Sequence, residues 1–219
     1  MDRSSLVTII FDFDGTLADT LGMVIDIINS VADKLGFAKI SPHDLPILRT
    51  LTTRELLKKF SIPLWKVPFI DRKVKKIFRE RLDAVTVFEG IPSILSDLKQ
   101  RGMRLGIVTS NEKSSVQAVL RRYQISDVLD FILSSRSIFG KGRVLKKVLR
   151  DQRLDKSRVL YVGDEIRDIE AAREAGIKVG AVSWGYNTRE ALMSRNPDFL
   201  ADHPRELVAI IDSIAPQRD

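Results

Sequence analysis

The fold is decided by the stretch Ile9-Ile10-Phe11-Asp12-Phe13-Asp14-Gly15-Thr16-Leu17. It continues an apolar and mostly β-branched run over residues 7–10, which predicts a buried strand. Side chains alternate along a strand, so the two phenylalanines should lie on one face. Asp12 and Asp14 should share the other, with Cα atoms about 7 Å apart. Gly15 then permits a sharp turn.

Paired carboxylates are an unusual way to end a buried strand. Bringing two negative charges together away from water raises their pKa values and costs stability. A divalent cation beside Asp12 and Asp14 removes this conflict, so the pair indicates a metal site. The alternative is a strand end at which both aspartates are solvated or cap the next turn.

Composition narrows the class of protein. The chain has 219 residues, 44% of them hydrophobic, enough for one large domain or for a domain with an insertion. No apolar run reaches the length of a membrane span, and the first residues lack a signal-peptide pattern. The absence of cysteine excludes disulfides and thiolate chemistry. We expect a cytoplasmic protein without a membrane partner, as a monomer or weak homodimer.

The formal net charge is +7, and much of the excess lies between residues 66 and 81. Apolar residues recur there at helical spacing, which predicts a solvated basic face on an amphipathic helix. A nucleic-acid patch requires clustered aromatic residues or a known module, so we expect no nucleic-acid partner. The same charge attracts an anionic substrate.

The pattern of apolar residues divides the chain into two kinds of segment. Residues 18–85 carry helix and loop patterns, and their first apolar stripe ends at Gly36. A second helical segment is expected to open at residues 41–44, and further helices over residues 53–60 and 71–84, while residues 85–88 are too short to assign. From residue 89 onward strands and helices alternate, which implies βαβ units and a parallel sheet. We therefore predict an α/β core of residues 1–17 and 86–219, interrupted by a helical domain over residues 18–85.

Polar residues follow three of the predicted strands. They are Asp12 with Asp14, then Thr109-Ser110-Asn111, then Asp164. Ligands of open parallel sheets bind beyond the carboxyl ends of the strands. These side chains should therefore meet at one edge of the sheet.

Lys141 has an unusual position for a cation. Lys141 precedes a predicted helix, where its charge faces the positive end of the helix dipole unless an anion lies nearby. The alternative is an exposed lysine in a glycine-containing loop.

Asp164 and Asp168 share one side of a helix if the helix begins at once. The alternative is an N-capping Asp164 and a surface Asp168.

These elements, in this order, resemble the haloacid dehalogenase-like hydrolase superfamily. Residues 12–16 look like its first motif, Thr109 like its second, Lys141 like its third, and Asp164 with Asp168 like its fourth. The resemblance implies a Rossmann-like parallel sheet flanked by helices, with an inserted all-helical cap.

Residues 183–187, Ser-Trp-Gly-Tyr-Asn, are similar to the phosphoglycolate-phosphatase-like branch of that superfamily. Two positions depart from the common pattern. Gly142 follows the motif lysine where many relatives have proline, and Ser110 separates the motif threonine from Asn111.

The resemblance implies a Mg²⁺-dependent phosphatase that hydrolyses a small phosphorylated metabolite through an aspartyl-phosphate. Asp12 would be the nucleophile and Asp14 the general acid and then base. Mg²⁺ would be held by the carboxylates of Asp12 and Asp164 and the backbone carbonyl of Asp14. Thr109 would hydrogen-bond the phosphoryl group, beside Ser110 and Asn111 in the substrate site. Lys141 would neutralise that group, and Asp168 would hold Lys141 or a metal-bound water.

In the helical insertion, Arg49 lies in a polar stretch between two apolar segments, which suggests a contact with an anionic leaving group. The alternative for this stretch is an ordinary helix start, capped by Thr52 or Thr53 with Glu55 in its first turn. Within the superfamily, Asp14 argues against a dehalogenase, because dehalogenases replace that second aspartate. A sugar phosphomutase, or a non-catalytic phosphate-binding protein, remains as an alternative function.

Overall fold

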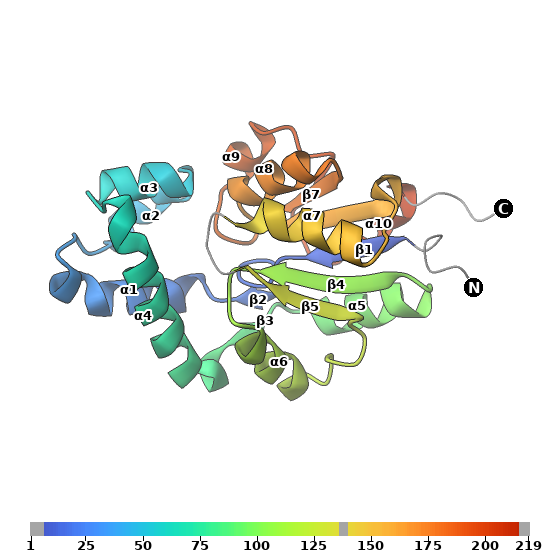
Figure 1. Ribbon diagram of the computed structural model, residues 1–219, viewed down its shortest axis with the longest axis horizontal. Helices are drawn as coiled ribbons and strands as arrows, with labels where there is room; N and C mark the ends of the chain where they lie inside the picture. Colours follow the sequence, from blue (N-terminus) through green and yellow to red (C-terminus); the bar gives the residue numbers. More distant parts are fainter. Residues whose placement is uncertain (1–6, 136–139, 215–219) are drawn as a thin grey trace.

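The computed structural model describes residues 7–135 and 140–214. Residues 1–6, 136–139 and 215–219, which belong to the predicted α/β core, lie outside these ranges. Within them, a six-stranded parallel sheet forms the centre of the molecule (Figure 1). Its order is β5 (Phe131–Ser134), β4 (Arg104–Thr109), β1 (Thr8–Phe11), β6 (Val159–Gly163), β7 (Lys178–Val182) and β8 (Phe199–Ala201).

Helices cover both faces of this sheet. On one face, α5 (Ile91–Gln100), α6 (Lys113–Arg122) and α10 (Glu206–Ile214) contribute to the apolar cluster that contains Phe11. On the other face, α7 (Lys141–Asp151) and α8 (Ile166–Ala175) pack on Ile10 and Tyr161. A short helix, α9 (Arg189–Met193), precedes β8. The predicted α/β fold with a parallel sheet is confirmed.

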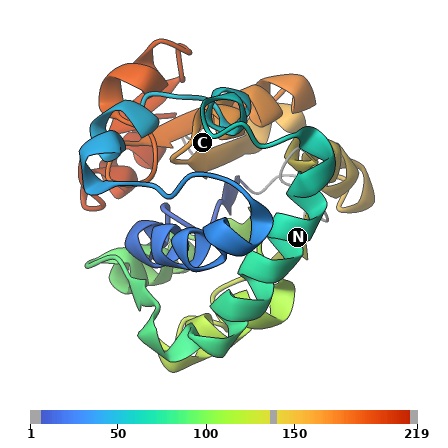
Figure 2. The same ribbon diagram turned by 90° about the vertical axis from the view of Figure 1, so that its left-hand side faces the viewer.

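The remaining helices form a separate layer, which we call the helical insert: α1 (Leu21–Leu35), α2 (Leu45–Leu48), α3 (Thr53–Lys59) and α4 (Val67–Glu80). It stands beyond the carboxyl ends of the central strands, as Figures 1 and 2 show. Among the described residues, no helix combines the length and apolarity that a membrane span requires.

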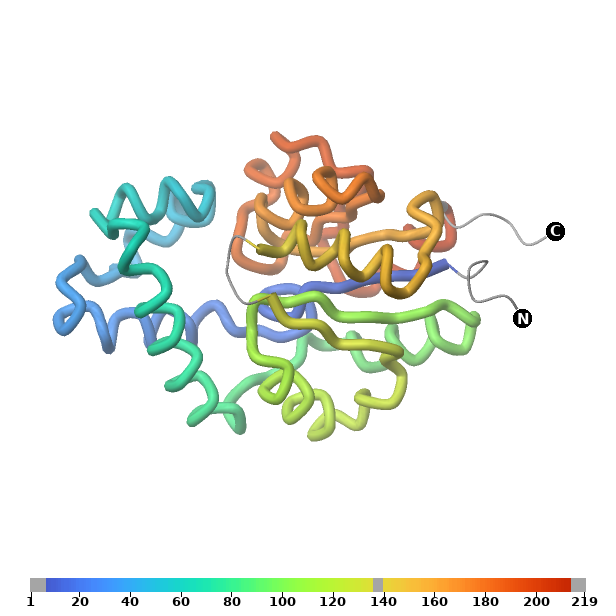
Figure 3. The backbone as a smooth tube through the Cα atoms, in the orientation of Figure 1, coloured from blue at the N-terminus to red at the C-terminus, as the bar shows by residue number. Residues whose placement is uncertain are grey.

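The chain passes between core and insert twice, and the two passages pair with each other. β2 (Ala18–Asp19) and β3 (Thr86–Val87) form a short antiparallel ribbon. The tube in Figure 3 shows the insert joined to the core on this side. The sequence pattern assigned no strand here, because two paired residues are too few to show an alternation.

Most predicted boundaries agree with the structure to within a few residues. α1 ends at Gly36, whose φ of 68° is a left-handed cap. α4 begins four residues before the predicted start at Asp71, because Pro68 lies in the first turn, where a missing N–H costs nothing. α3 begins as a capping box of Thr52 and Glu55, which confirms the alternative interpretation of that stretch.

Candidate active site

The turn after β1 presents the two predicted aspartates. The strand ends at Phe11, and the amides of Leu17 and Ala18 both donate to the carbonyl of Phe13 at 2.9 Å. Both phenylalanines are buried in one apolar cluster, so the prediction that they lie on one face is confirmed. Asp12 is buried and Asp14 is half-buried at the edge of the sheet.

Lys141 is the buried cation of the site. It is the first residue of α7 and is 3% exposed. Its Nζ donates to Asp12 Oδ2 at 2.6 Å and also forms an ion pair with Asp168. Burial lowers the pKa of Lys141, but the two carboxylates outweigh it and hold this pKa above its ordinary value. The anion expected near this lysine is therefore present, and the exposed-lysine alternative is wrong.

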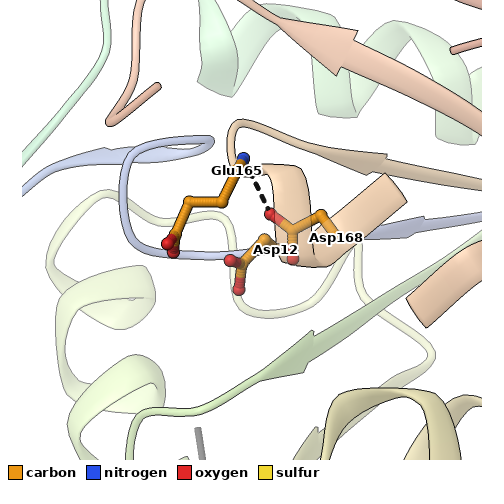
Figure 4. Close-up of side chains that lie close together, drawn as sticks. All are labelled: Asp12, Glu165 and Asp168. Atoms are coloured by element: carbon orange, nitrogen blue, oxygen red, sulfur yellow. Dashed lines mark hydrogen bonds between the residues drawn. The ribbon is translucent and has the colours of Figure 1, made fainter. Parts of the chain in front are cut away.

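Asp168 is placed by the first turn of α8. That helix begins at Ile166, and Asp168 Oδ2 accepts a hydrogen bond from the Glu165 amide at 3.1 Å (Figure 4). The helix therefore starts after Asp164, so the condition under which Asp164 and Asp168 would share one side of a helix is not met. Glu165, not Asp164, is the N-cap, and Asp168 is fully buried rather than at the surface.

Asp164 lies at the end of β6 and accepts two hydrogen bonds. Thr16 Oγ1 donates to its Oδ1 at 2.6 Å, and the Tyr186 amide donates to its Oδ2 at 2.7 Å. A Cβ at Gly15 or Gly185 would lie 2.1 or 2.3 Å from the same Oδ2. Two glycines therefore make the space in which this carboxylate is held.

The residues after β4 lie beside Asp14. Asn111 donates from Nδ2 to Asp14 Oδ2 at 3.2 Å, and Thr109 Oγ1 accepts from the Asn111 amide at 3.0 Å. Thr109 is buried, whereas Ser110 and Asn111 line a cavity that also reaches Asp14. Burial raises the pKa of Asp14, as a group that donates a proton requires.

Acidic groups outnumber basic ones here, which fits a divalent cation. Burial raises the pKa of Asp12 to about 7 even though Lys141 lowers it, and burial raises the pKa of Asp164 well above its ordinary range. Among the described residues, carboxylate oxygens of Asp12, Glu165 and Asp168 approach within 4.8 Å of one another (Figure 4). Hard oxygen ligands of this kind are those that Mg²⁺ binds.

Three residues were missed by sequence reasoning. Glu165 joins the acidic group, Arg167 pairs with Glu165, and Tyr186 supplies the amide that holds Asp164. Glu165 directly follows the motif aspartate, which was the available signal. The role of Tyr186 depends on its backbone and could not be read from its side chain.

Arg49 contacts the core. Its Nε donates to the Tyr186 carbonyl at 3.1 Å and its Nη2 to the Gly185 carbonyl at 2.8 Å. The Arg49 carbonyl in turn accepts from the Thr188 amide at 2.9 Å. Arg49 is not among the residues that line the cavity beside Asp14. Its predicted contact with a leaving group stays a prediction.

Comparison with known proteins identifies the class of this protein. The family of haloacid dehalogenase-like hydrolases matches residues 9–182, which include all four motif positions. The chain belongs to this family.

Its relatives narrow the class further. The chain is 32% identical to a phosphoglycolate phosphatase of Synechococcus elongatus, over 95% of this chain and 99% of the relative. It is 28% identical to an N-acetylmuramic acid 6-phosphate phosphatase of Pseudomonas aeruginosa, over 97% of each chain. The protein is therefore a hydrolase that acts on phosphate monoesters.

Solved structures support the same fold. A structure described as a predicted phosphatase from Clostridium acetobutylicum superposes with a TM-score of 0.83 over 96% of this chain and all of the other. At 18% identity, this likeness shows the fold alone.

Proposed function

We propose that this phosphatase hydrolyses a small phosphorylated metabolite in a Mg²⁺-dependent reaction, through an aspartyl-phosphate on Asp12. The observation that carries the proposal is the contact between the Asp12 carboxylate and Lys141, next to Asp14 at the mouth of a cavity. A carboxylate held by a buried ammonium has a fixed orientation. The same ammonium can neutralise an incoming phosphoryl group.

In the first half-reaction, a carboxylate oxygen of Asp12 attacks phosphorus and the ester oxygen leaves. Asp14, protonated, donates its proton to that leaving oxygen. In the second, the Asp14 carboxylate accepts a proton from a water molecule, which attacks the same phosphorus. Inorganic phosphate is released and the Asp12 carboxylate is restored.

The remaining residues position these groups. Lys141 holds Asp12 and faces the phosphoryl oxygens, while Asp168 keeps Lys141 in place. Thr109 is positioned by the Asn111 amide to donate to the phosphoryl group. We propose that Mg²⁺ is held by Asp12, Asp164 and the Asp14 carbonyl, with Glu165 and Asp168 nearby. The ion would neutralise charge on the phosphoryl group.

We also propose that the helical insert, together with its two linkers over residues 18–85, acts as a cap over this site. Its place beyond the carboxyl ends of the strands supports this assignment (Figure 2). A cap that closes excludes bulk water from the reacting groups.

The test is release of phosphate from an aryl phosphate ester. We expect turnover with Mg²⁺, none with EDTA, and a phosphorylated peptide containing Asp12 after rapid acid quench. A phosphomutase would instead transfer the phosphoryl group and release little inorganic phosphate. Turnover without any phosphorylated Asp12 peptide would refute the covalent route.

A further inference from the structure

The cavity beside Asp14 is built largely by the helical insert. Its volume is about 270 Å³, and most of its lining side chains are aliphatic or phenylalanine. Ile28 of α1, Leu57 of α3, Phe60 directly after α3, and Ile70 and Val74 of α4 all contribute. Each of these five side chains is only half-buried. The insert therefore leaves apolar surface facing this space.

The cavity is continuous with the catalytic edge of the core. Asp14, Ser110, Asn111 and Tyr186 line it on the core side. In the proposed reaction, Asp14 lies at the leaving oxygen of the ester. Whatever is attached to that oxygen therefore extends from Asp14 into the apolar part of the cavity.

The described cations on the cavity wall already have acidic partners. Lys75 Nζ lies 2.7 Å from Asp71 Oδ2, and both side chains are at most 23% exposed. Arg167 forms an ion pair with Glu165. A carboxylate on the leaving group would have to compete with Asp71 or Glu165 for these cations. It would also leave the apolar wall of the cavity in contact with water, which costs free energy.

We propose that the preferred substrates are phosphate monoesters whose leaving group carries an extended apolar part, and that this part occupies the cavity of the helical insert. The inference rests on the proposed phosphatase reaction and adds the class of leaving group. Apolar contact remote from phosphorus supplies binding energy that positions the ester for attack. A short carboxylate-bearing leaving group such as glycolate obtains little of it.

A series of n-alkyl phosphates tests this directly, because lengthening the chain hardly changes the chemistry at phosphorus. Ethyl, butyl, hexyl and octyl phosphate are compared with 2-phosphoglycolate, each with Mg²⁺. We expect kcat/KM to rise about fourfold per added methylene until the cavity is full. We also expect hexyl phosphate to exceed 2-phosphoglycolate. A flat or falling series, or a clear preference for 2-phosphoglycolate, would overturn the inference.

Two substitutions of one wall residue locate the effect. Leu57→Gln keeps a similar size but places an amide in the cavity, so the hexyl-to-ethyl ratio of kcat/KM should fall about tenfold. Leu57→Trp fills space and should move the optimum to a shorter chain. The matched control is Leu64→Gln in the same insert, where leucine is 65% exposed and outside the cavity lining. This control should reproduce the wild-type series, and equal slopes in all four proteins would place the alkyl chain elsewhere.

The design separates this inference from the proposed reaction. If no ester is hydrolysed, including an aryl phosphate, the proposed reaction fails. Calorimetric binding of the same alkyl phosphates then decides the inference alone. Affinity that rises with chain length and falls in Leu57→Gln supports it, whereas affinity independent of length contradicts it.

Discussion

At the scale of single residues, the charged side chains of the site meet at Asp12. Its Oδ2 contacts Lys141, its Oδ1 accepts from the Phe13 amide at 2.8 Å, and it approaches Glu165 and Asp168. Both oxygens are therefore oriented before any ligand arrives. A nucleophile held in this way needs little reorganisation during attack.

Asp12→Asn should abolish turnover while the protein stays folded, because an amide cannot form the acyl phosphate. The measurement is kcat/KM on an aryl phosphate, with circular dichroism to confirm folding. Asp19→Asn is the matched control, since Asp19 is exposed on β2, and it should retain wild-type activity. Activity above a few per cent of wild type in Asp12→Asn would remove Asp12 from the nucleophile's role.

Lys141→Ala should lower kcat/KM at least about 10²-fold, the usual effect of removing one group that stabilises developing charge. The neighbouring cation is the natural comparison, because Arg143 is exposed on the same helix while Lys141 is buried. Arg143→Ala should change kcat/KM less than twofold. The measurement is steady-state kinetics of both variants. A large loss of activity in Arg143→Ala together with an active Lys141→Ala would assign the phosphoryl-binding role to Arg143 instead.

The raised carboxylate pKa values predict how Mg²⁺ binding depends on pH. The folded pKa of Asp12, about 7, exceeds its ordinary value of 3.8, so the folded protein binds more protons than the unfolded chain between these values. The metal-free protein should therefore lose stability as pH rises from about 4 to about 7. A bound cation requires the ionised carboxylates, so it should stabilise more strongly at high pH.

Thermal unfolding with Mg²⁺ or EDTA at pH 5 and pH 8 measures this effect. We expect the Mg²⁺-induced rise in Tm to be larger at pH 8. Asp164→Ala should reduce it, whereas Asp19→Asn should leave it intact. A rise in Tm that is the same at both pH values, or is unaffected by Asp164→Ala, would mean that the ion is held elsewhere.

At the scale of elements, the sequence predicted those helix ends and strands that depend on neighbouring residues alone. The end of α1 follows from Gly36, and the buried strands follow from runs of β-branched residues such as those before Phe11. The site residues that directly follow these strands were also predictable, because parallel strands bring their carboxyl ends to one edge of the sheet. Asp12, Thr109 and Asp164 are such positions.

The remaining features depend on contacts between distant segments. The β2–β3 ribbon pairs residues 18–19 with 86–87, and nothing in either pair alone indicates a strand. The amide of Tyr186 reaches Asp164 only because the loop after β7 lies beside the end of β6. The ion pair between Arg167 and Glu165 depends on where α8 begins. No periodicity in the sequence carries this information.

The loop between α2 and α3 yields the next prediction. Arg49 donates to two carbonyls of the core, and Asn187 Nδ2 donates back to the carbonyls of Arg49 and Leu51. We expect Arg49→Ala to raise KM for the preferred substrate because the insert is held less firmly over the site. If Arg49 acts only through the insert, ethyl phosphate, whose leaving group reaches little of the cavity, should be nearly unaffected.

Arg54→Ala is the control for that comparison, because Arg54 is exposed on the neighbouring helix α3. It should leave KM for both substrates unchanged. An equal loss for Arg49→Ala on both substrates would mean that Arg49 supports the phosphate site or the fold itself, and its role at the leaving group should then be dropped.

At the scale of the whole molecule, the insert contacts the core at its base and near its tip. At the base, Ile27 of α1 and Phe78 of α4 belong to the same apolar cluster as Phe13. Near the tip, hydrogen bonds join Arg49 to residues 185–188. Apolar packing at one end and a few hydrogen bonds at the other favour rotation about the base, with the tip contacts breaking first.

A reversible cross-link at the tip tests whether that rotation is needed for turnover. The Thr188 amide donates to the Arg49 carbonyl at 2.9 Å, so the two residues are in direct backbone contact and are candidates for an engineered disulfide. The natural chain has no cysteine, so an Arg49→Cys/Thr188→Cys variant contains a single possible pair. Oxidation should lower kcat/KM on hexyl phosphate at least about tenfold, because the leaving group enters the cavity when the insert moves away from the core.

Reduction should restore the activity to that of the two single variants, which control for the loss of the native side chains. Comparing oxidised and reduced forms of the same double variant then separates the effect of restricting the insert's movement from the effect of the two substitutions. An oxidised protein as active as its reduced form would show that substrate enters and product leaves with the insert fixed. The cavity would then be a permanent binding pocket, open to solvent without rotation of the insert.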